Sequence, residues 1–334
     1  MTRAAAIAAA ALSLAIAPRS ANDRALYRVD RDVYLMGTHA RLETYAATRQ
    51  QGMATLDRAL AILEQTEDEL STWREHSAIT TLNQYPVGHP WQATRELCAT
   101  FVELFRLQRI TGGTFDPAIG TLTDAWGIHE TGRVPSPAAL HEARRASGMR
   151  LLEFDRRACT LTRRGDVTVD VGAWGKGEAI DRVRRALPDA RWLIDFGGQI
   201  GVSGIPPDER AWAASLAHPR VRAEGMFTVW LREGSIATSA GSERDLLVRG
   251  RRIAHHLDPR TGEPVSFDGS VSVWHASALV ADALSTALYV MGPDEGLRWA
   301  EQHKVAACYL VPDDKHVERK MTTEFRALLS LPAR

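Results

Sequence analysis

The sequence predicts an α+β fold with mixed, largely antiparallel sheets flanked by helices. Short β-rich segments alternate with segments of helical periodicity, and hairpin-like returns such as Val248-Arg249-Gly250-Arg251 imply antiparallel pairing. The 334 residues contain no internal repeat or low-complexity linker, which favours one continuous catalytic unit over residues 22–334. Basic and acidic side chains balance at 41 each, and no arginine-rich stripe occurs. We therefore expect no nucleic-acid binding.

The N-terminal half is predicted to contain a strand followed by three helices. The strand lies near 34–45, and apolar residues then recur at spacings of three and four over 53–63, as on one face of a helix. Thr94 opens a second helix that ends at Gly112-Gly113. Ser136-Pro137 provides a cap and a first-turn proline for the third.

The C-terminal half is predicted to alternate strands with two helices. The helices cover 175–187 and 276–292. A hairpin is expected at 151–154 and 159–162, and further strands at 167–171, 192–196, 227–231, 246–248, 253–257, 271–274 and 306–311.

The N-terminus has the pattern of a secretory signal peptide, predicted over residues 1–21. Arg3 precedes an apolar, alanine-rich run over 4–17 that is too short to span a bilayer comfortably. Ser13-Leu14-Ala15 is a suitable cleavage sequence. The alternative is an alanine-rich tail of a cytosolic protein.

The three cysteines do not have the spacing of a zinc site. Cys98, Cys159 and Cys308 are far apart and form no Cys-x-x-Cys pair. Cys98 lies on an apolar helix face and Cys308 in an apolar strand, where buried thiols are common. No cysteine follows the apolar leader, so a lipoprotein anchor is not expected.

Asp282 is the most informative candidate site residue. It lies in a helix of small and apolar residues that should be largely buried, and an unpaired buried carboxylate costs several kcal/mol. Ser285 and Thr286 follow at i+3 and i+4, so three oxygen groups share one helical face. Such hard oxygen donors suit Mg²⁺. A carboxylate hydrogen-bonded to hydroxyls or backbone amides is the alternative, and this helix alone does not separate the two.

Generic nucleotide-binding signatures are absent from the sequence. The segment 172–177 (Gly-Ala-Trp-Gly-Lys-Gly) follows Asp170 and opens a predicted helix. Backbone amides at a helix N-terminus, with Lys176 as a counter-charge, suit a phosphate. A tight turn between strand and helix is the simpler interpretation of this segment alone.

Two further segments combine polar groups with turns. In Gly113-Thr114-Phe115-Asp116-Pro117, the aromatic side chain could belong to the core and Asp116 to an Asx turn. His255 and His256 precede an Asp-Pro turn. Adjacent histidines on a strand point to opposite faces, so we do not expect them to bind one metal together.

The joint order of these segments resembles the ApbE family of FAD:protein FMN transferases. The resemblance runs from about Met36 to the C-terminal region. Nine segments carry it: Met36-Gly37-Thr38, Leu70-Ser71-Thr72-Trp73, Leu82-Asn83, Gly113-Thr114-Phe115-Asp116-Pro117, 170–181, Asp195-Phe196-Gly197-Gly198, Ala237-Thr238-Ser239, 255–262 and 281–286.

The resemblance implies an exported bacterial enzyme that uses FAD and Mg²⁺. It would transfer FMN to a threonine hydroxyl of an acceptor protein, forming a phosphoester and releasing AMP. The implied acceptors are flavoprotein subunits of Nqr- or Rnf-type membrane redox complexes, or a regulator of nitrous oxide respiration. The absence of an anchor cysteine implies a soluble periplasmic form.

The resemblance also implies roles for individual residues. His255 would assist proton transfer, and Asp282 would be both a metal ligand and a catalytic residue. The implied metal ligands are Asp282, Ser285, Thr286 and the main-chain carbonyl of Ala173. The implied FAD contacts are Met36, Trp73, Thr114, Phe115, Asp116, Asp170, Lys176 and Leu257.

The chain departs from the family pattern at two places. Thr238-Ser239-Ala240-Gly241-Ser242 stands where the family often has Thr-Ser-Gly-Asp-Tyr, which puts contacts on the substrate side in doubt. Ser285 replaces a carboxylate of some relatives, so a metal there would keep an extra water. An FAD pyrophosphatase that yields FMN and AMP, or a periplasmic FAD-binding flavin donor, would use almost the same pocket.

Overall fold

The structure is a computed structural model that describes residues 26–329, except 208, 222, 242–244, 249 and 314. The predicted signal peptide at 1–21 lies outside the described residues. No helix in the described part of the chain is long and apolar enough to cross a membrane.

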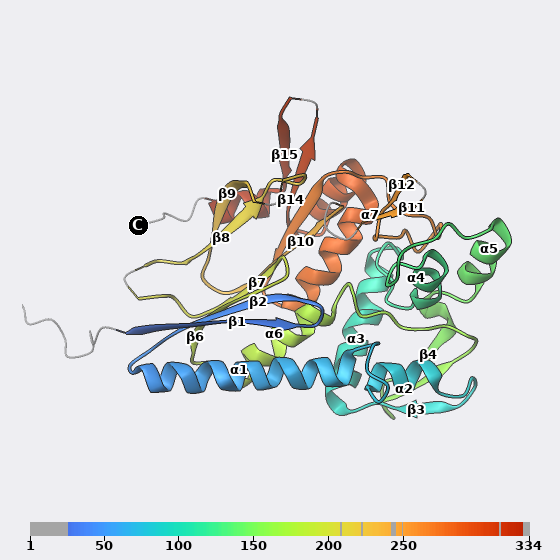
Figure 1. Cartoon of the computed structure of the whole chain (residues 1–334), viewed down its shortest axis with the longest axis horizontal. Helices are drawn as coiled ribbons and strands as arrows, with labels where there is room; N and C mark the ends of the chain where they lie inside the picture. Colours follow the sequence, from blue (N-terminus) through green and yellow to red (C-terminus); the bar gives the residue numbers. More distant parts are fainter. Residues whose placement is uncertain are drawn as a thin grey trace, which may run out of the picture.

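An eight-stranded sheet forms the centre of the molecule, and all of its neighbouring strands are antiparallel (Figure 1). Its strands, in spatial order, are β1 (Tyr27–Leu35), β2 (Thr38–Ala46), β6 (Arg191–Phe196), β7 (Gln199–Ser203), β10 (Gly234–Ala240), β13 (Ser270–His275), β14 (Ala306–Pro312) and β15 (Val317–Met321). The predicted antiparallel α+β class is therefore confirmed.

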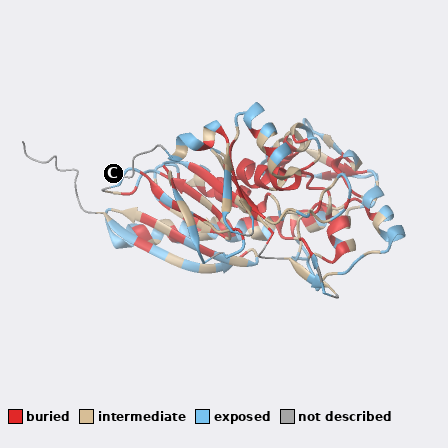
Figure 2. Ribbon diagram, turned by 90° about the horizontal axis from the view of Figure 1, so that it is seen from above, coloured by how far each residue is buried: buried red, intermediate tan, exposed pale blue. Residues whose placement is uncertain are grey.

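Different elements cover the two faces of this sheet. The helices α1 (Arg49–Leu70), α6 (Gly175–Ala186) and α7 (Ala278–Gln302) pack on one face, and β8 (Trp212–Ala217), β9 (Gly225–Leu231) and α8 (Thr323–Leu329) lie on the other. In strand β7, successive residues face opposite sides of the sheet. A Cβ at Gly201 would lie 2.4 Å from Ile180 of α6, whereas Val202 belongs to the cluster that contains Trp212 of β8. Buried residues accordingly lie along the middle of the molecule (Figure 2).

A mainly helical region adjoins the lower end of α7 (Figure 1). Its elements are α2 (Ala78–Gln84), β3 (Pro90–Gln92), α3 (Arg95–Ile110), α4 (Gly120–Trp126), α5 (Pro137–Arg145), the 3₁₀ turn Met149–Leu151, β4 (Leu152–Asp155) and β5 (Thr160–Arg163). A small hairpin, β11 (Leu246–Val248) and β12 (Arg251–Ile253), completes the fold. Phe101 and Leu104 of α3 share a buried cluster with Leu284 and Leu288 of α7, so this region and the sheet have a continuous core.

The predicted helix starts at Thr94 and Ser136 are confirmed. Their hydroxyls accept hydrogen bonds from Leu97 N and Ala139 N at 3.2 Å, which satisfies amides that have no partner within the helix. The predicted hairpin at 151–162 is present as β4 and β5.

Three sequence predictions need correction. The strand predicted at 34–45 crosses a turn, because Met36 and Gly37 adopt φ of 47° and 71° between β1 and β2. Segment 167–171 is extended but is not a strand: the Asn83 side chain donates to Val169 O at 2.9 Å and accepts from Val169 N at 2.8 Å. The main chain of Pro117 and Gly120 bonds to Asp170 N and Thr168 O, so a side chain and a loop take the place of a neighbouring strand. The strand predicted at 253–257 ends at Ile253.

Cys98 is not a free thiol. It forms a disulfide with Cys159, which links α3 to the loop before β5, while Cys308 is free and buried. The sequence showed an apolar helix position but gave no sign that residue 159 lies beside it.

Candidate functional site

A cavity of about 420 Å³ lies where the N-terminal end of α6 meets α7, β10 and the His255 segment. Seven of the residues predicted for the site line it: Asp170, Ala173, Lys176, His255, Leu257, Asp282 and Thr286. The fold therefore brings residues that lie up to 116 positions apart in the sequence to one cavity.

The close contact between α6 and α7 places Asp282 at this cavity. A Cβ at Gly177 would lie 2.4 Å from Ala278 O and 2.6 Å from Leu279 Cα, so only glycine permits this approach. Gly177 N then donates to Asp282 Oδ2 at 3.1 Å. Gly177 therefore has a packing role, inside the first turn of α6.

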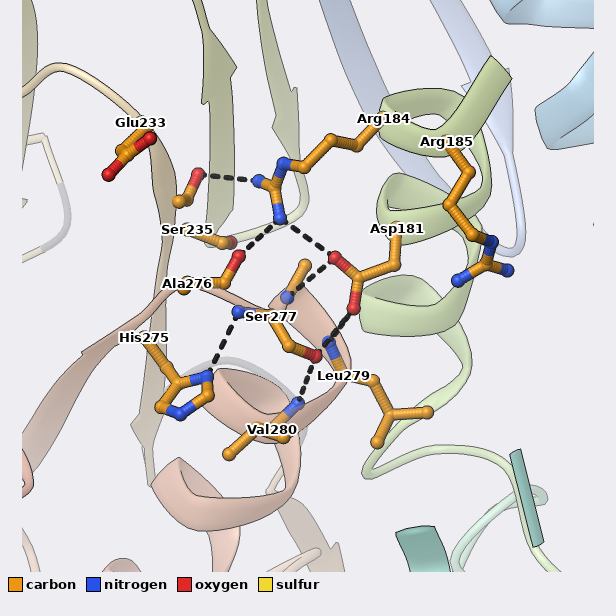
Figure 3. A network of polar contacts seen from close by, with 12 residues as sticks. Asp181, Arg184, Arg185, Glu233, Ser235, His275, Ala276, Ser277, Leu279 and Val280 are labelled. Carbon is orange, nitrogen blue, oxygen red and sulfur yellow. Dashed lines mark hydrogen bonds and ion pairs between the residues drawn. The ribbon is translucent and has the colours of Figure 1, made fainter. Parts of the chain in front are cut away.

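A buried carboxylate on α6 fixes the start of α7 (Figure 3). Asp181 accepts hydrogen bonds from Ser277 Oγ at 2.6 Å, Ala278 N at 2.8 Å and Leu279 N at 3.0 Å. Arg184 Nη1 lies 2.9 Å from Asp181 Oδ1, which balances the buried charge. An acidic group is favourable at a helix N-terminus, so this cap holds the helix that carries Asp282.

The Asp282 carboxylate is buried and faces a cation. Lys176 Nζ lies 3.6 Å from Asp282 Oδ1, and the side chain of Asp282 is 7% exposed. Oδ2 is occupied by the Gly177 amide, so Oδ1 is the oxygen nearer the ammonium group. The carboxylate therefore has the backbone amide donor that one alternative from the sequence predicts. It also borders a cavity, as the metal-ligand alternative requires.

Ser285 lies behind the cavity lining. Its hydroxyl is within hydrogen-bond distance of Ser239 Oγ at 2.9 Å and donates to Asp282 O at 2.8 Å. Ser285 is 1% exposed, whereas Ser239 and Thr286 line the cavity. Ser285 therefore supports the cavity wall in this structure, and its assignment as a metal ligand stays a prediction.

The donor set around Asp282 fits Mg²⁺. One carboxylate, the Thr286 hydroxyl and the Ala173 main chain belong to residues that line the cavity, and all three are hard oxygen donors. No group of three His, Cys, Asp or Glu side chains in the described ranges could hold a metal. This arrangement suits a cation that takes one protein carboxylate together with substrate phosphates and water.

Asp170 lies just before the segment 172–177 that leads into α6, and its carboxylate pairs with a histidine side chain. His129 Nε2 lies 2.7 Å from Asp170 Oδ2, and Gly172 N donates to Oδ1 at 2.7 Å. Burial acts to raise the pKa of Asp170, but these hydrogen bonds outweigh burial and hold the pKa below its ordinary value. Asp170 is therefore a fixed negative charge in the cavity wall.

His255 and His256 both line the cavity, which corrects the expectation of opposite faces. Their ring centroids are 4.0 Å apart, because the segment after β12 is not a strand. His255 Nδ1 lies 2.9 Å from Asp245 Oδ1, and Arg252 Nε donates to Asp245 Oδ2 at 2.6 Å. Burial acts to raise the pKa of Asp245, but the bonds from His255 and Arg252 lower it overall.

Five residues that the resemblance implies as FAD contacts are not in the cavity lining: Met36, Trp73, Thr114, Phe115 and Asp116. Trp73 is 74% exposed and its ring lies 5.8 Å from that of His129, so it is close to the cavity wall. The methyl group of Met36 is 3.4 Å from the Cβ position of Gly175, at the start of α6. Trp73 therefore contacts a residue of the cavity lining, whereas Met36 lies beside the first turn of α6.

The other three are part of the supporting structure. Thr114 and Phe115 are 1% exposed. Asp116 Oδ1 accepts from Ala118 N at 2.9 Å, which is the Asx turn left open by the sequence, and Oδ2 accepts from Met149 N at 3.0 Å. Burial raises the pKa of Asp116. Their contact with FAD stays a prediction.

Sequence reasoning missed several residues of the cavity. His129 follows the C-terminal turn of α4 and showed no pattern. Gln199 is buried; it donates to Ala278 O at 2.7 Å, and its Oε1 has no hydrogen-bond partner among the described residues. Residues 215–219, from β8 and the turn after it, also line the cavity. Asp245 was also missed, although the predicted 248–251 return indicated that residues near 245 and 255 approach each other.

Known proteins resemble this chain in sequence over most of its length. The model of the ApbE family matches residues 36–310. A FAD:protein FMN transferase of Vibrio cholerae is 28% identical over 279 residues, covering 80% of this chain and 83% of the relative. Another, from Chlamydia trachomatis, is 29% identical over 268 residues, which cover 77% of this chain and 82% of the relative.

Solved structures show the same fold. The ApbE protein of Thermotoga maritima has a TM-score of 0.83 and 25% identity, covering 90% of this chain and 99% of that chain. The flavin transferase ApbE of Vibrio cholerae has a TM-score of 0.80 and 25% identity, and the match covers 91% of this chain and 99% of that chain. The predicted family and the predicted ApbE-like fold are both confirmed: this chain is a member of the ApbE family.

Proposed function

We propose that this protein is a Mg²⁺-dependent FAD:protein FMN transferase. The observation that carries the proposal is the joint placement of Lys176, Asp282 and His255 on one cavity, with Lys176 in the first turn of α6. A cation, a carboxylate with hard oxygen neighbours and an imidazole are the groups that phosphoryl transfer from a pyrophosphate needs. Relatives that match most of the chain are named FAD:protein FMN transferases, which supports the transfer reaction.

The reaction transfers FMN from FAD to a threonine hydroxyl of an acceptor protein. The threonine oxygen forms a bond to the FMN phosphorus, and the bond from that phosphorus to the bridging oxygen breaks. The electron pair of that bond leaves with AMP. The threonine proton passes to His255, which returns it to solvent. No nucleophile of this chain is required.

The charges of the cavity suit this chemistry. Mg²⁺, when bound at Asp282, Thr286 and the Ala173 carbonyl, would neutralise the charge that develops on the pyrophosphate oxygens. Lys176 lies at the N-terminal end of α6, where its ammonium and the helix amides favour an anionic phosphate. Gly177 and Asp181 hold these groups in place through α7.

Incubation with FAD, Mg²⁺ and a candidate acceptor, followed by intact mass measurement, tests this function. We propose acceptor flavoprotein subunits of the Nqr or Rnf type, or a regulator of nitrous oxide respiration. A covalent increment of one FMN on the acceptor, lost when its target threonine is changed to valine, supports the proposal. Free FMN with AMP would assign an FAD pyrophosphatase instead, and unchanged FAD would assign a flavin donor.

We also propose that the protein is exported to the periplasm as a soluble form. The Arg3-plus-apolar pattern at the N-terminus supports export, and so does the Cys98–Cys159 disulfide, because such bonds persist in oxidising compartments. N-terminal sequencing of protein from the periplasmic fraction should find a start between roughly residues 16 and 22. An intact Met1 on cytoplasmic protein would contradict export.

A further inference from the structure

We propose that Asp245 is a positioning residue, which orients His255 and fixes its tautomer for proton transfer. This inference rests on the proposed function, because it assigns a partner to the imidazole that would accept the threonine proton. It makes the His255 site a carboxylate–histidine pair rather than a lone histidine. The pair joins the segment before β11 to the segment after β12.

Asp245 makes two hydrogen-bond contacts with His255. Asp245 Oδ1 lies 2.9 Å from His255 Nδ1 and also accepts from His255 N at 3.1 Å. The Asp245 side chain is 6% exposed and that of His255 is 17% exposed. The carboxylate therefore holds both the ring and the backbone of His255, and solvent does not compete strongly for the ring nitrogen.

A network of ion pairs fixes the carboxylate in turn. Arg252 donates from Nε to Asp245 Oδ2 at 2.6 Å, from Nη1 to Asp268 Oδ1 at 2.9 Å and from Nη2 to Gly241 O at 2.9 Å. Arg220 donates to Asp268 Oδ2 at 2.9 Å. With all three guanidinium nitrogens of Arg252 in use, Asp245 has little freedom to rotate away from His255.

The geometry determines which nitrogen of His255 can act as a base. An ionised carboxylate only accepts hydrogen bonds, so it favours the tautomer with the proton on Nδ1. Nε2 then carries the lone pair and is the ring nitrogen left for the cavity that His255 lines. When Nε2 takes the threonine proton, the adjacent negative charge of Asp245 stabilises the imidazolium.

The other groups around the pair do not provide this function. His256 lies beside the ring of His255, and the ring of Tyr289 is 4.5 Å from that of His256. Burial raises the pKa of Tyr289, so its hydroxyl stays protonated through the neutral range. Arg252 is a cation on the far side of Asp245. Asp245 is therefore the carboxylate in contact with the His255 ring.

A purely structural role for Asp245 makes a different prediction. In that case the carboxylate would only hold the β11–β12 hairpin, and its loss would lower stability without changing the chemistry of His255. Asp268→Asn is the matched control, because Asp268 binds the same Arg252 but makes no contact with His255. Asp245→Glu is the conservative variant that keeps the charge.

The experiment compares wild type, Asp245→Asn, Asp245→Glu and Asp268→Asn in FMN transfer at several pH values. We expect kcat of Asp245→Asn to fall about tenfold to a hundredfold, which is at or below the low end of the roughly 10²–10⁴-fold that general acid–base catalysis contributes, because His255 itself remains; KM for FAD should change less than about twofold. Asp245→Glu should recover part of the rate, and Asp268→Asn should lose less rate than Asp245→Asn, because Arg252 keeps its bonds to Asp245 and Gly241.

Nitrogen-15 NMR of the His255 ring gives a readout that does not depend on activity. Wild type and Asp268→Asn should show the proton on Nδ1 at high pH, and Asp245→Asn should show a shift toward the Nε2–H form. An unchanged tautomer in folded Asp245→Asn would overturn the inference, as would equal losses of rate in Asp245→Asn and Asp268→Asn. If the wild type transfers no FMN, the proposed function fails, and the tautomer then decides this inference alone.

Discussion

The amide of Gly177 donates a 3.1 Å hydrogen bond to Asp282 Oδ2, across 105 positions of the chain. This bond joins the N-terminal turn of α6 to the second turn of α7, at the point where the two helices are too close for any side chain on residue 177. The N-terminal end of α6, which carries Lys176, and the carboxylate of α7 are therefore held as one unit.

Asp282→Asn should abolish Mg²⁺ binding and transfer while leaving the fold intact. The amide oxygen of asparagine can still accept from Gly177 N, but the charge that a cation needs is lost. We expect the rate of transfer to fall about a hundredfold or more, since a bound metal would lower the activation barrier by several kcal/mol. The melting temperature without metal should change little or rise. Calorimetric titration with Mg²⁺ and thermal melts measure both effects.

Asp294→Asn is the matched control for this change. Asp294 lies on the part of α7 that follows the kink at Gly292, and its side chain is 81% exposed. Its loss should affect neither Mg²⁺ affinity nor transfer. Wild-type Mg²⁺ affinity in Asp282→Asn would remove the metal assignment, and a large loss of stability with normal specific activity would make the carboxylate purely structural. Thr286→Val should act in the same direction more weakly, because it removes a neutral donor.

Lys176→Ala should weaken FAD binding without unfolding the protein. The ammonium group lines the cavity at the start of α6, where it can offset phosphate charge, and its side chain is only 18% exposed. We expect the Kd for FAD to rise about tenfold, the effect of about 1.4 kcal/mol. Fluorescence titration with FAD measures the change.

Lys320→Ala provides the comparison for Lys176. Lys320 lies on β15, and its Nζ is 3.4 Å from Asp294 Oδ1. Lys320 is not part of the cavity lining. Its replacement should leave FAD affinity unchanged. Equal FAD affinity in both variants and the wild type would show that Lys176 serves only to neutralise Asp282.

Gly177→Ala should destabilise the protein, although alanine is the better helix former. The added Cβ would meet Ala278 O at 2.4 Å, so α6 and α7 must separate. We expect a loss of about 1–3 kcal/mol in the free energy of unfolding, typical of overpacking, and a loss of transfer because Asp282 moves. Urea denaturation measures the first effect. Gly165→Ala is the control, since nothing lies within 4 Å of its Cβ position; equal stability of the two variants would contradict the packing argument.

The Cys98–Cys159 disulfide should stabilise the region that contains α3. Its sequence separation is 61 residues, and a bond that closes a loop of this length contributes about 2–4 kcal/mol. Reducing agent should therefore lower the melting temperature of the wild type. The double variant Cys98→Ser/Cys159→Ser should melt at the lower temperature with or without reductant.

Thiol counting checks the pairing directly. Of the three cysteines, only Cys308 is free in the structure, so unreduced protein in denaturant should expose one thiol per chain. Three thiols in protein purified from the periplasm would contradict the disulfide.

Local patterns predicted the longer helices but not the short α2, α4 and α8, because caps and apolar spacing over several turns are encoded locally, whereas a helix of two turns carries little periodicity. Thr94 and Ser136 begin helices by accepting from amides three positions later, and that contact requires no distant partner. The 167–171 segment was predicted wrongly for the opposite reason. Its partners are the side chain of Asn83 and the main chain of Pro117 and Gly120, and a β-rich sequence cannot show whether a strand, a loop or a side chain satisfies its backbone.

The sequence by itself determined the family, the antiparallel α+β class and the candidate groups around Lys176, His255 and Asp282, because residue type and order were sufficient for these. Tertiary structure decided which of those groups share a cavity. It buried Asp116 in an Asx turn and placed Ser285 behind the cavity wall. It also paired His255 with Asp245, and Cys98 with Cys159. Each outcome depends on contacts between segments distant in the chain, and those contacts arise only when α6, α7 and the sheet pack together.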